Sequence, residues 1–558
     1  MPNIKTPLML WNEFDDSLDV TAITLKERVI DGIRYEDVSL LGRETGEGRV
    51  KIFGVFASDE KAPASETVLI LPDSLEGIDY DLLKMFVSRG YSAFMVDYRG
   101  EWEDSEFTTL YPLNVAYANT LKCGRHKDFV DETADKTSWY EWVGVGIYAR
   151  KYLVERTGGE NIAVVGIRDG GEIAWKLGVA KKFSCIITAC AAGWKAYAGV
   201  SKFKPDDTEL DEERYRFIAG IDSQAYAPYV KSPVMILCST NDPRFDYDRA
   251  FDTLSRINTE FADDSVITYS VRCDSSIGEK SSADMFMFLD KHLRHRQVFI
   301  PKPAEVNVTV DDEDNLVAIA SFDEQGNVEE AGMFMAEDCI DSSMREWSMC
   351  KLKRKISSSE YEYYLNVYEK ASSVYALCFV KYTNGFTIWS KIAVKKISGA
   401  FRNMCGKCRV MYTSKNGIDG FSIADPASRA IGGTFFTDGV MFPQLVTKEK
   451  GIKGAYSVCG LTTYRINNPK YSPESGNFLK LDMFCDETAE VTLTLEDVTD
   501  GEVYKCGQIV LGGVWQSIIL ESKLFKTVNG APLSDYVRTL RLCITCEGKY
   551  AVNNLMWL

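Results

Sequence analysis

The chain has 558 residues and a formal net charge of −17, with 45% hydrophobic and 26% charged residues. This length exceeds a single hydrophobic core and predicts three or four folded units, while the composition is ordinary for globular protein. The acidic balance disfavours nucleic acid or an anionic membrane as a partner, because both require clustered Lys and Arg.

The N-terminal stretch, residues 1–20, does not resemble a secretory signal, because it holds one lysine and only a short apolar run. No window approaches 18 uninterrupted apolar residues, so we expect no membrane span. The 15 cysteines are scattered and odd in number, which favours reduced thiols over a disulfide framework. These features predict a cytoplasmic protein.

Strands and helices alternate in the first half of the chain. Residues 49–56 show the period-2 pattern of a half-buried strand and are expected to form part of a β extension. Further predicted strands are 67–71, 93–96, 162–165, 185–189, 234–238 and 266–271, and predicted helices are 80–88, 139–154 and 283–295. Continuous apolar strands separated by helices predict a mostly parallel sheet with helices on both faces.

The most informative stretch is residues 161–178, where an apolar strand meets a glycine-bracketed turn and then a helical pattern. Strand, sharp turn and helix make the local plan of the nucleophile elbow, G-x-S-x-G. The middle position, bracketed by Gly166 and Gly170, is Arg168, which stays protonated and has no lone pair with which to attack. The sequence thus predicts a catalytic scaffold without its attacking atom.

The second half of the chain is predicted to be all-β. Pro301 and Pro303 interrupt the helical periodicity, and short strands follow at 306–310, 316–320, 361–367, 374–382 and 387–394, with a hairpin turn at 383–385. A second β-rich segment includes strands at 477–483, 490–495, 515–520 and 539–544. We expect three domains: an α/β-hydrolase-like domain with a β extension (1–300), an Ig-like β-sandwich (301–398) and a jelly-roll-like β-sandwich (399–558).

Residues 65–297 resemble the α/β-hydrolase fold, and more narrowly its acetyl xylan esterase and prolyl-oligopeptidase-like branch. The motifs that carry the resemblance are the elbow at 166–171, the strand end at 97–100 and the strand that closes on Asn241 and Asp242. The segment from about residue 399 resembles a jelly-roll carbohydrate-binding module through residues 512–515 and 553–557.

The resemblance to α/β hydrolases implies a nucleophile, an acid and a histidine in that chain order. The nucleophile position falls on Arg168 and the acid on Asp242, whereas residues 272–278, where the histidine is expected, contain none. The degenerate site therefore comprises Arg168, Asp242, Ser275 and Ser276. Of the three histidines, His126 lies in a mixed segment, and His292 and His295 are expected at the C-terminal end of the last helix.

Two interpretations of Arg168 stay open at this point. The first is an anion site, in which the guanidinium and the backbone N–H groups of the elbow and of the loop 72–77 bind a carboxylate or phosphate. Its expected ligand-binding residues are Arg168, Asp169, Gly170, Asp73 and Ser74. The second is a buried ion pair with Asp242 that fills a dead site.

Other chemistry is less well supported. Asp169 as a nucleophile would place Ile167 where the elbow needs its first glycine, and Cys273 has no neighbouring base. Two C-x-x-C pairs, 405–408 and 543–546, have the spacing of zinc ligands, but the second lies in a predicted strand, where positions three apart face opposite sides. We therefore predict neither a metal nor a cofactor.

These observations predict a catalytically degenerate esterase-like protein that works by ligand binding or assembly. The expected partners are a carbohydrate or small anionic ligand and further copies of the chain, through the β domains. One alternative is an active serine-type carbohydrate esterase or peptidase with an unrecognised nucleophile. Another is a structural, self-assembling subunit.

Overall fold

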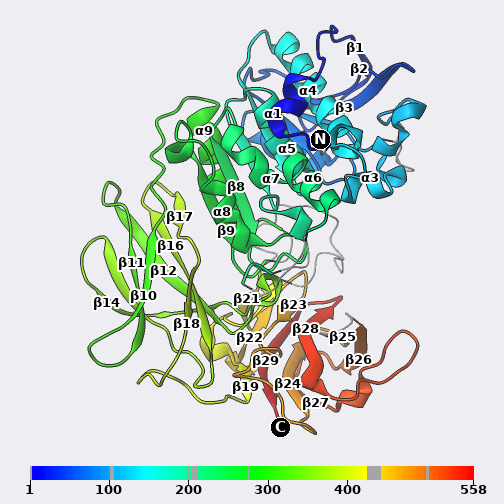
Figure 1. Ribbon diagram of the computed structural model, residues 1–558. Helices are drawn as coiled ribbons and strands as arrows, with labels where there is room; N and C mark the ends of the chain where they lie inside the picture. The colour runs from blue at the N-terminus through cyan, green and yellow to red at the C-terminus, as the bar shows by residue number, and fades with distance from the viewer. Residues whose placement is uncertain are drawn as a thin grey trace. The chain divides into compact units, whose positions relative to one another are not determined.

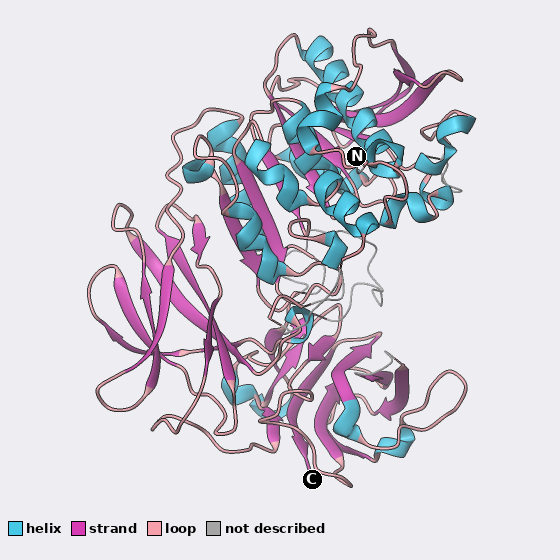
Figure 2. Cartoon of the chain, in the orientation of Figure 1, coloured by secondary structure: helices cyan, strands magenta, loops and turns pink. Residues whose placement is uncertain are grey.

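The computed structural model describes residues 3–100, 106–197, 201–203, 210–273, 276–423, 442–497 and 502–558. The chain forms two compact units. The first is Met1–Cys238, Arg244–Thr268 and Ser281–Ile300, and the second is Ser239–Pro243, Tyr269–Lys280 and Pro301–Leu558. Helices are concentrated in the first 300 residues, and strands dominate the rest of the chain (Figure 2).

A nine-stranded sheet organises the first unit, with strand order β1-β2-β3-β5-β4-β6-β7-β8-β9 (Figure 1). Neighbouring strands are antiparallel in the first part of this order, β1-β2-β3-β5. They are parallel in the part β5-β4-β6-β7-β8. The strand bounds are β1 Ala22–Ile30, β2 Ile33–Glu44, β3 Arg49–Asp59, β4 Thr67–Leu71, β5 Ser92–Asp97, β6 Ile162–Ile167, β7 Ile186–Ala189, β8 Val234–Ser239 and β9 Val266–Ser270.

Helices cover this sheet on both faces, because every side chain of β4, β5 and β6 is buried although neighbours along a strand point to opposite sides. The helices α2, α4 and α5 pack against its strands. The α-helix bounds are α1 Pro7–Asn12, α2 Tyr80–Ser88, α3 Arg125–Asp128, α4 Ser138–Thr157, α5 Asp169–Ala180, α6 Glu212–Gly220, α7 Ser223–Tyr226, α8 Ala250–Leu254 and α9 Glu279–His292.

Four antiparallel sheets build the β part of the second unit. The first two have the orders β10-β11-β15-β14 and β13-β12-β16-β17, with β18 on β16. Their strands are β10 Glu305–Val310, β11 Leu316–Ser321, β12 Val328–Glu337, β13 Ser348–Met349, β14 Lys351–Lys355, β15 Glu360–Tyr364, β16 Ser373–Tyr382, β17 Thr387–Trp389 and β18 Ala393–Lys396. The predicted hairpin turn joins β16 to β17, with Gly385 at φ +96°.

The other two sheets follow from residue 410, with the orders β21-β22-β29-β24-β27, carrying β19 on β29, and β20-β23-β28-β25-β26. Their strands are β19 Val410–Tyr412, β20 Ser422–Ile423, β21 Gln444–Thr447, β22 Lys453–Tyr456, β23 Leu461–Thr463, β24 Leu479–Cys485, β25 Ala489–Asp497, β26 Val503–Val510, β27 Gln516–Leu520, β28 Thr539–Cys546 and β29 Tyr550–Trp557. A buried apolar cluster that includes Leu493, Ile544 and Trp557 fills this part. The all-β character of the second half is confirmed, while its Ig-like and jelly-roll types and the three-domain division stay predictions.

Three predicted elements were wrong in detail. The last helix begins at Glu279 and ends at His292, so His295 lies beyond it, with φ +53°. The predicted strand 361–367 ends at Tyr364, and 387–394 divides into β17 and β18, which pair with different parts of β16. Strand propensity does not show such interruptions, because they depend on which partner each residue meets.

No helix among the described residues is long and apolar enough to cross a membrane.

Candidate functional site

The elbow keeps its backbone shape although it carries arginine. Strand β6 ends at Ile167, Arg168 follows with φ +49° and ψ −111°, and α5 starts at Asp169. Residues other than glycine rarely adopt a positive φ angle. Such a backbone conformation persists only where the surrounding structure enforces it. Arg168 therefore occupies the strained position that the nucleophile takes in G-x-S-x-G.

Glycines enforce this turn by leaving no room for a side chain. A Cβ on Gly166 would lie 2.2 Å from the carbonyl oxygen of Gly170, and one on Gly170 would lie 2.1 Å from that of Leu71. Gly171 would meet the Cβ of Ala191 at 2.5 Å. Since two of these three obstacles are backbone atoms, the close approach of β6, α5 and the end of β4 requires glycine.

Arg168 is held by carboxylates of the loop that follows β4. Its Nη1 lies 3.1 Å from Asp73 Oδ2 and 3.9 Å from Glu76 Oε1. Arg244 Nη1 also reaches Asp73 Oδ2, at 3.3 Å. The Asp73 side chain is only 3% exposed, so one buried carboxylate oxygen receives two guanidinium groups.

Asp169 is the second centre of charge. Lys127 Nζ lies 2.6 Å from its Oδ2 and Lys195 Nζ lies 2.8 Å from its Oδ1, while Ser74 Oγ donates a hydrogen bond to Oδ2 at 2.5 Å. Burial by itself would raise the pKa of Asp169, but the ammonium groups of Lys195 and Lys127 lower this pKa well below its usual range. Asp169 is therefore an ionised carboxylate with both oxygens engaged. We call Asp73, Ser74, Lys127, Arg168, Asp169 and Lys195 the elbow cluster.

Neighbouring buried groups position Lys195. Its backbone N–H donates to Asp222 Oδ1 at 2.7 Å, and its ammonium lies 4.6 Å from the ring centroid of Trp139. Lys176 lies 5.0 Å from the same ring centroid. Burial opposes the charge of Lys195, but Asp169 and Glu172 raise the pKa of this lysine above its ordinary value.

The predicted ligand-binding residues thus come together at one place. Arg168 contacts Asp73, Ser74 contacts Asp169, and the Gly170 backbone packs against the end of β4. Parallel strands β4 and β6 are neighbours, so the loops at their carboxyl ends meet. The elbow cluster holds three cations, Lys127, Arg168 and Lys195, against the two carboxylates Asp73 and Asp169, so one positive charge is in excess. An excess of positive charge is chemically suited to an anion.

The other residues predicted for the degenerate site are placed as follows. Asp242 lies just after β8 and is 1% exposed, and Ser276 is fully buried, with its carbonyl oxygen accepting a hydrogen bond from Ser239 Oγ. Ser275 lies outside the described residues. An ion pair between Arg168 and Asp242 stays a prediction.

The histidines occupy other surroundings. His126 stacks on Tyr117, with ring centroids 4.3 Å apart, and its Nδ1 lies 2.9 Å from the carbonyl oxygen of Lys136. His292 ends α9 and packs on Phe288, and burial lowers its pKa to about 4. A neutral, packed imidazole at a helix end is a structural residue.

The cysteines of the two C-x-x-C pairs contact different neighbours. In β28, Cys543 Sγ lies 3.0 Å from Thr462 Oγ1. Cys546 lies close to Cys485, and burial together with this neighbour raises the pKa of the Cys485 thiol. Cys405 Sγ donates to the carbonyl oxygen of Val367 at 3.2 Å. Among the described residues, no group of three or more His, Cys, Asp or Glu side chains is arranged to hold a metal ion.

Sequence reasoning missed the two lysines and the second arginine of this region. Lys195 follows β7 closely, and a polar residue after a buried parallel strand is a usable signal for such a site. Lys127 lies in the short helix α3, inside a segment without periodicity, so nothing in the sequence pointed to it. Arg244 follows β8 and carried the same signal as Lys195.

Comparison with known proteins finds similarity in solved structures only: no protein-family model and no curated protein matches the sequence. An acetyl xylan esterase from Paenibacillus is 14% identical, with a TM-score of 0.38, and the match covers 51% of this chain and 92% of that one. Acetyl xylan esterase 1 from Thermoanaerobacterium is 16% identical, with a TM-score of 0.36, covering 49% and 88%. An esterase from Pyrococcus furiosus is 15% identical, with a TM-score of 0.31, covering 46% and 93%.

The sheet order, the parallel centre and the elbow between β6 and α5 define the first unit as an α/β-hydrolase core. Antiparallel β structure follows it in the second half of the chain.

Proposed function

We propose that this protein is a catalytically degenerate esterase-like protein that acts by ligand binding or assembly. The observation that carries the proposal is Arg168 at φ +49°, in the nucleophile position, with its guanidinium bonded to Asp73. A protonated guanidinium neither attacks a carbonyl carbon nor accepts a proton. The scaffold for acyl transfer is kept, and its central atom is replaced by a fixed positive charge.

The surrounding charges support the same proposal. Asp169, the only carboxylate in the elbow turn, is bonded to two lysines and a serine hydroxyl. Its strongly lowered pKa makes it a poor proton acceptor. A carboxylate saturated in this way stabilises structure and is unsuited to serve as a base or nucleophile.

A small anion or a carbohydrate is the ligand class we propose for the elbow. Arg244 is 54% exposed while its guanidinium reaches the buried Asp73, so it joins the cluster to solvent. A ligand carboxylate or phosphate that meets Arg244 competes with Asp73 for a charge-assisted, bidentate contact. Asp73→Asn keeps the volume and removes the competing charge, so it is expected to tighten binding of inorganic phosphate, measured by calorimetry. Unchanged affinity in a folded variant argues against an anion site here.

Assembly is supported by exposed apolar side chains on edge strands. Ile509 on β26 is 74% exposed and Ile519 on β27 is 55% exposed, and each strand lies at the end of its sheet. Such edges offer unpaired backbone groups to another chain. We expect Ile509→Lys to lower the fraction of the protein that is oligomeric, as measured by analytical ultracentrifugation. A chain that stays monomeric at high concentration contradicts assembly.

The second candidate, an active serine hydrolase, has one specific residue in its favour. Ser74 Oγ accepts a hydrogen bond from Lys127 Nζ at 3.0 Å, which is the contact of a serine with a lysine base. However, the Ser74 hydroxyl donates its own hydrogen to Asp169, and Lys127 is already paired with that carboxylate. This geometry favours the degenerate protein over the enzyme.

Fluorophosphonate labelling together with p-nitrophenyl acetate hydrolysis separates the two candidates. The degenerate protein is expected to show neither labelling nor saturable hydrolysis, and Ser74→Ala is expected to change nothing. Labelling that maps to Ser74 and disappears in Ser74→Ala would establish the enzyme and overturn our proposal. An active serine esterase run in parallel verifies the probe.

A further inference from the structure

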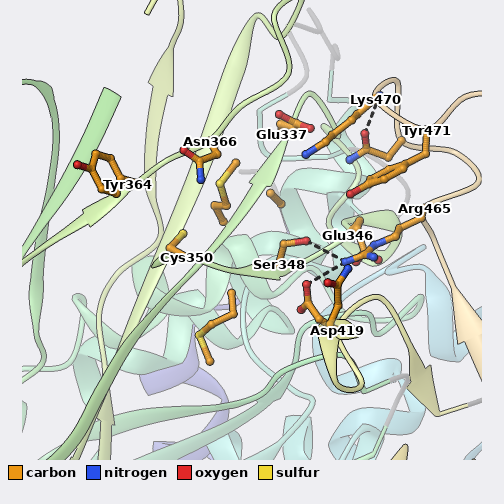
Figure 3. A pocket seen from close by; sticks show the side chains of 15 residues that line it. Glu337, Glu346, Ser348, Cys350, Tyr364, Asn366, Asp419, Arg465, Lys470 and Tyr471 are labelled. Carbon is orange, nitrogen blue, oxygen red and sulfur yellow. Dashed lines mark hydrogen bonds and ion pairs between the residues drawn. The ribbon is translucent and has the colours of Figure 1, made fainter. Parts of the chain in front are cut away.

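A cavity of about 200 Å³ lies in the β part of the second unit, and nothing assigned so far uses it. It is lined by residues of β12, β13 and β15 on one side and of the segment 416–471 on the other (Figure 3). Its lining residues are Met335, Ala336, Glu337, Glu346, Ser348, Met349, Cys350, Tyr364, Asn366, Asn416, Asp419, Arg465, Asn468, Lys470 and Tyr471. We call it the Arg465 cavity.

The deep wall of the cavity is an ion network that is already satisfied. Arg465 is 3% exposed, and its Nε lies 3.1 Å from Glu346 Oε1 while its Nη2 lies 2.9 Å from Asp419 Oδ2. Its Nη1 donates to the carbonyl oxygen of Met411 at 2.6 Å, and Arg272 forms a further ion pair with Asp419. Because these charges compensate one another, the network needs no counter-ion from a ligand.

The remaining charges of the lining also compensate. Lys470 and Glu337 face the same space from opposite sides (Figure 3). Glu337 Oε2 accepts a hydrogen bond from the backbone N–H of Tyr368 at 2.6 Å, and burial raises the pKa of Glu337. A cavity whose charges balance discriminates against a charged ligand, because the ion would lose its hydration without gaining a free counter-charge.

Neutral polar residues with capacity for hydrogen bonds line the cavity, namely Asn366, Asn416 and Tyr471. Their backbone carbonyl oxygens accept hydrogen bonds from Cys405, Asp419 and Trp557, respectively. The Tyr471 hydroxyl is directed toward Ser348 across the cavity (Figure 3). Amides and hydroxyls both donate and accept, so they match a ligand whose own groups do both.

Two further features fix this lining in place. Trp557, which is 2% exposed, donates from Nε1 to the carbonyl oxygen of Tyr471 at 2.7 Å. Gly420 adopts φ +102°, and a Cβ there would lie 2.5 Å from the Arg465 guanidinium carbon. The loop that carries Asp419 therefore approaches Arg465 so closely that only glycine fits at position 420. This close contact holds Asp419 and Arg465 in one arrangement.

We propose that the Arg465 cavity binds an uncharged, polyhydroxylated small molecule of the size of one sugar ring. Hydroxyl groups of such a molecule pair with the amides and the Tyr471 hydroxyl. The volume is below the roughly 300–1,000 Å³ of sites for larger ligands, so one ring fits and a longer chain does not. This site is separate from the elbow and does not depend on the function proposed there.

Saturation-transfer NMR on the full chain tests this site with D-xylose, D-glucose, D-galactose and N-acetyl-D-glucosamine, each titrated alone. We expect saturable binding of at least one sugar. Asn366→Leu and Tyr471→Phe each remove polar contacts at nearly constant shape and are expected to weaken binding roughly two- to tenfold. Ser348→Leu fills the cavity and is expected to abolish binding.

Asn307→Leu is the matched control, because Asn307 is an exposed amide on β10 outside the cavity. It is expected to leave binding unchanged, and melting temperatures verify that each variant is folded. No saturable binding by any of the four sugars overturns the proposal. So does binding that survives Ser348→Leu in a folded protein, or inorganic phosphate competing with the sugar, since the latter indicates an anion site.

Discussion

Two paired arginines, the half-buried Arg168 and the buried Arg465, show how differently paired charges can be used. At the elbow, Arg168 is forced into positive φ and bonds to Asp73, while the lysines nearby bond to Asp169. In the β part, Arg465 bonds to two carboxylates and thereby forms one wall of a cavity that also carries neutral amides and hydroxyls. A ligand at the elbow therefore has to compete for paired charges, whereas a ligand in the cavity can use neutral groups.

The largest expected effect is on stability, from Arg465→Met. Removing the guanidinium leaves the buried carboxylate of Glu346 without the Arg465 charge, whereas Asp419 keeps its ion pair with Arg272. Breaking a buried ion pair in this way costs about 3–5 kcal/mol. Native-state hydrogen exchange read by mass spectrometry localises the loss, which we expect in peptides covering residues 461–471. Arg409→Met is the control, because Arg409 is 66% exposed and lies 3.9 Å from its partner Glu474. Equal effects of the two substitutions contradict the importance of the buried network.

The elbow depends on backbone contact more than on its charges, and Gly170→Ala tests this. The added methyl group would lie 2.1 Å from the Leu71 carbonyl oxygen, so the backbone must shift at a cost of about 1–3 kcal/mol. Exchange is expected to rise in peptides covering 162–178 and to stay unchanged at 461–471. Gly159→Ala, where nothing lies within 4 Å of the added Cβ, is expected to be neutral or slightly stabilising.

Acidification is expected to change the free energy of unfolding in opposite directions through Asp169 at the elbow and Glu337 in the cavity lining. The pKa of Asp169 is lowered from 3.8, so its contribution to stability is present above pH 3.8 and is lost as the pH falls further. The pKa of Glu337 is raised from 4.5, so its contribution is present below pH 4.5 and is lost as the pH rises. The free energy of unfolding is to be measured across this pH range. We expect the pH dependence caused by Asp169 to disappear in Asp169→Asn, and the pH dependence caused by Glu337 to disappear in Glu337→Gln. Identical pH profiles of both variants would refute the assignment.

The smallest expected effect is on activity, from Arg168→Ser. Restoring a hydroxyl at the elbow supplies an attacking atom but no effective base, since His126 and His292 are packed against other residues and the strongly lowered pKa of Asp169 makes its carboxylate a weak proton acceptor. We expect the p-nitrophenyl acetate hydrolysis rate to equal that of the unmodified chain. A saturable gain in hydrolysis would show that a base is within reach and that the site lost only its nucleophile.

The hydrolase core was readable from sequence because its signals are local. Buried parallel strands are continuous apolar runs, so β4 and β6 were located within two residues, and α2 was predicted with its exact bounds. The elbow was recognised from Gly166 and Gly170, whose absent side chains are a steric requirement of the turn. By contrast, β12 and β14 were missed, since charged residues interrupt their alternation.

Only part of the candidate site could be predicted from the sequence, because only part of it lies in segments with a local pattern. Arg168 and Asp169 were found from the glycine-bracketed elbow, and Asp73 and Ser74 from the resemblance of the loop 72–77 to an oxyanion-hole loop, whereas Lys127 lies in a segment without a pattern. The Arg465 cavity had no sequence signal at all. Its lining residues are drawn from positions 335 to 471, and no spacing rule connects them.

The sequence by itself determined that arginine stands in a glycine-bracketed turn between a strand and a helix and that residues 272–278 hold no histidine, because both depend on residue identity at fixed local positions. Tertiary structure decided what those identities mean. The meeting of the β4 and β6 loops brings Arg168 to Asp73, and α3 and the segment after β7 bring Lys127 and Lys195 to Asp169. Contacts between residues far apart in the chain set burial and charge balance, and these two quantities distinguish the elbow cluster, where an anion must compete with Asp73, from the Arg465 cavity, where the charges balance.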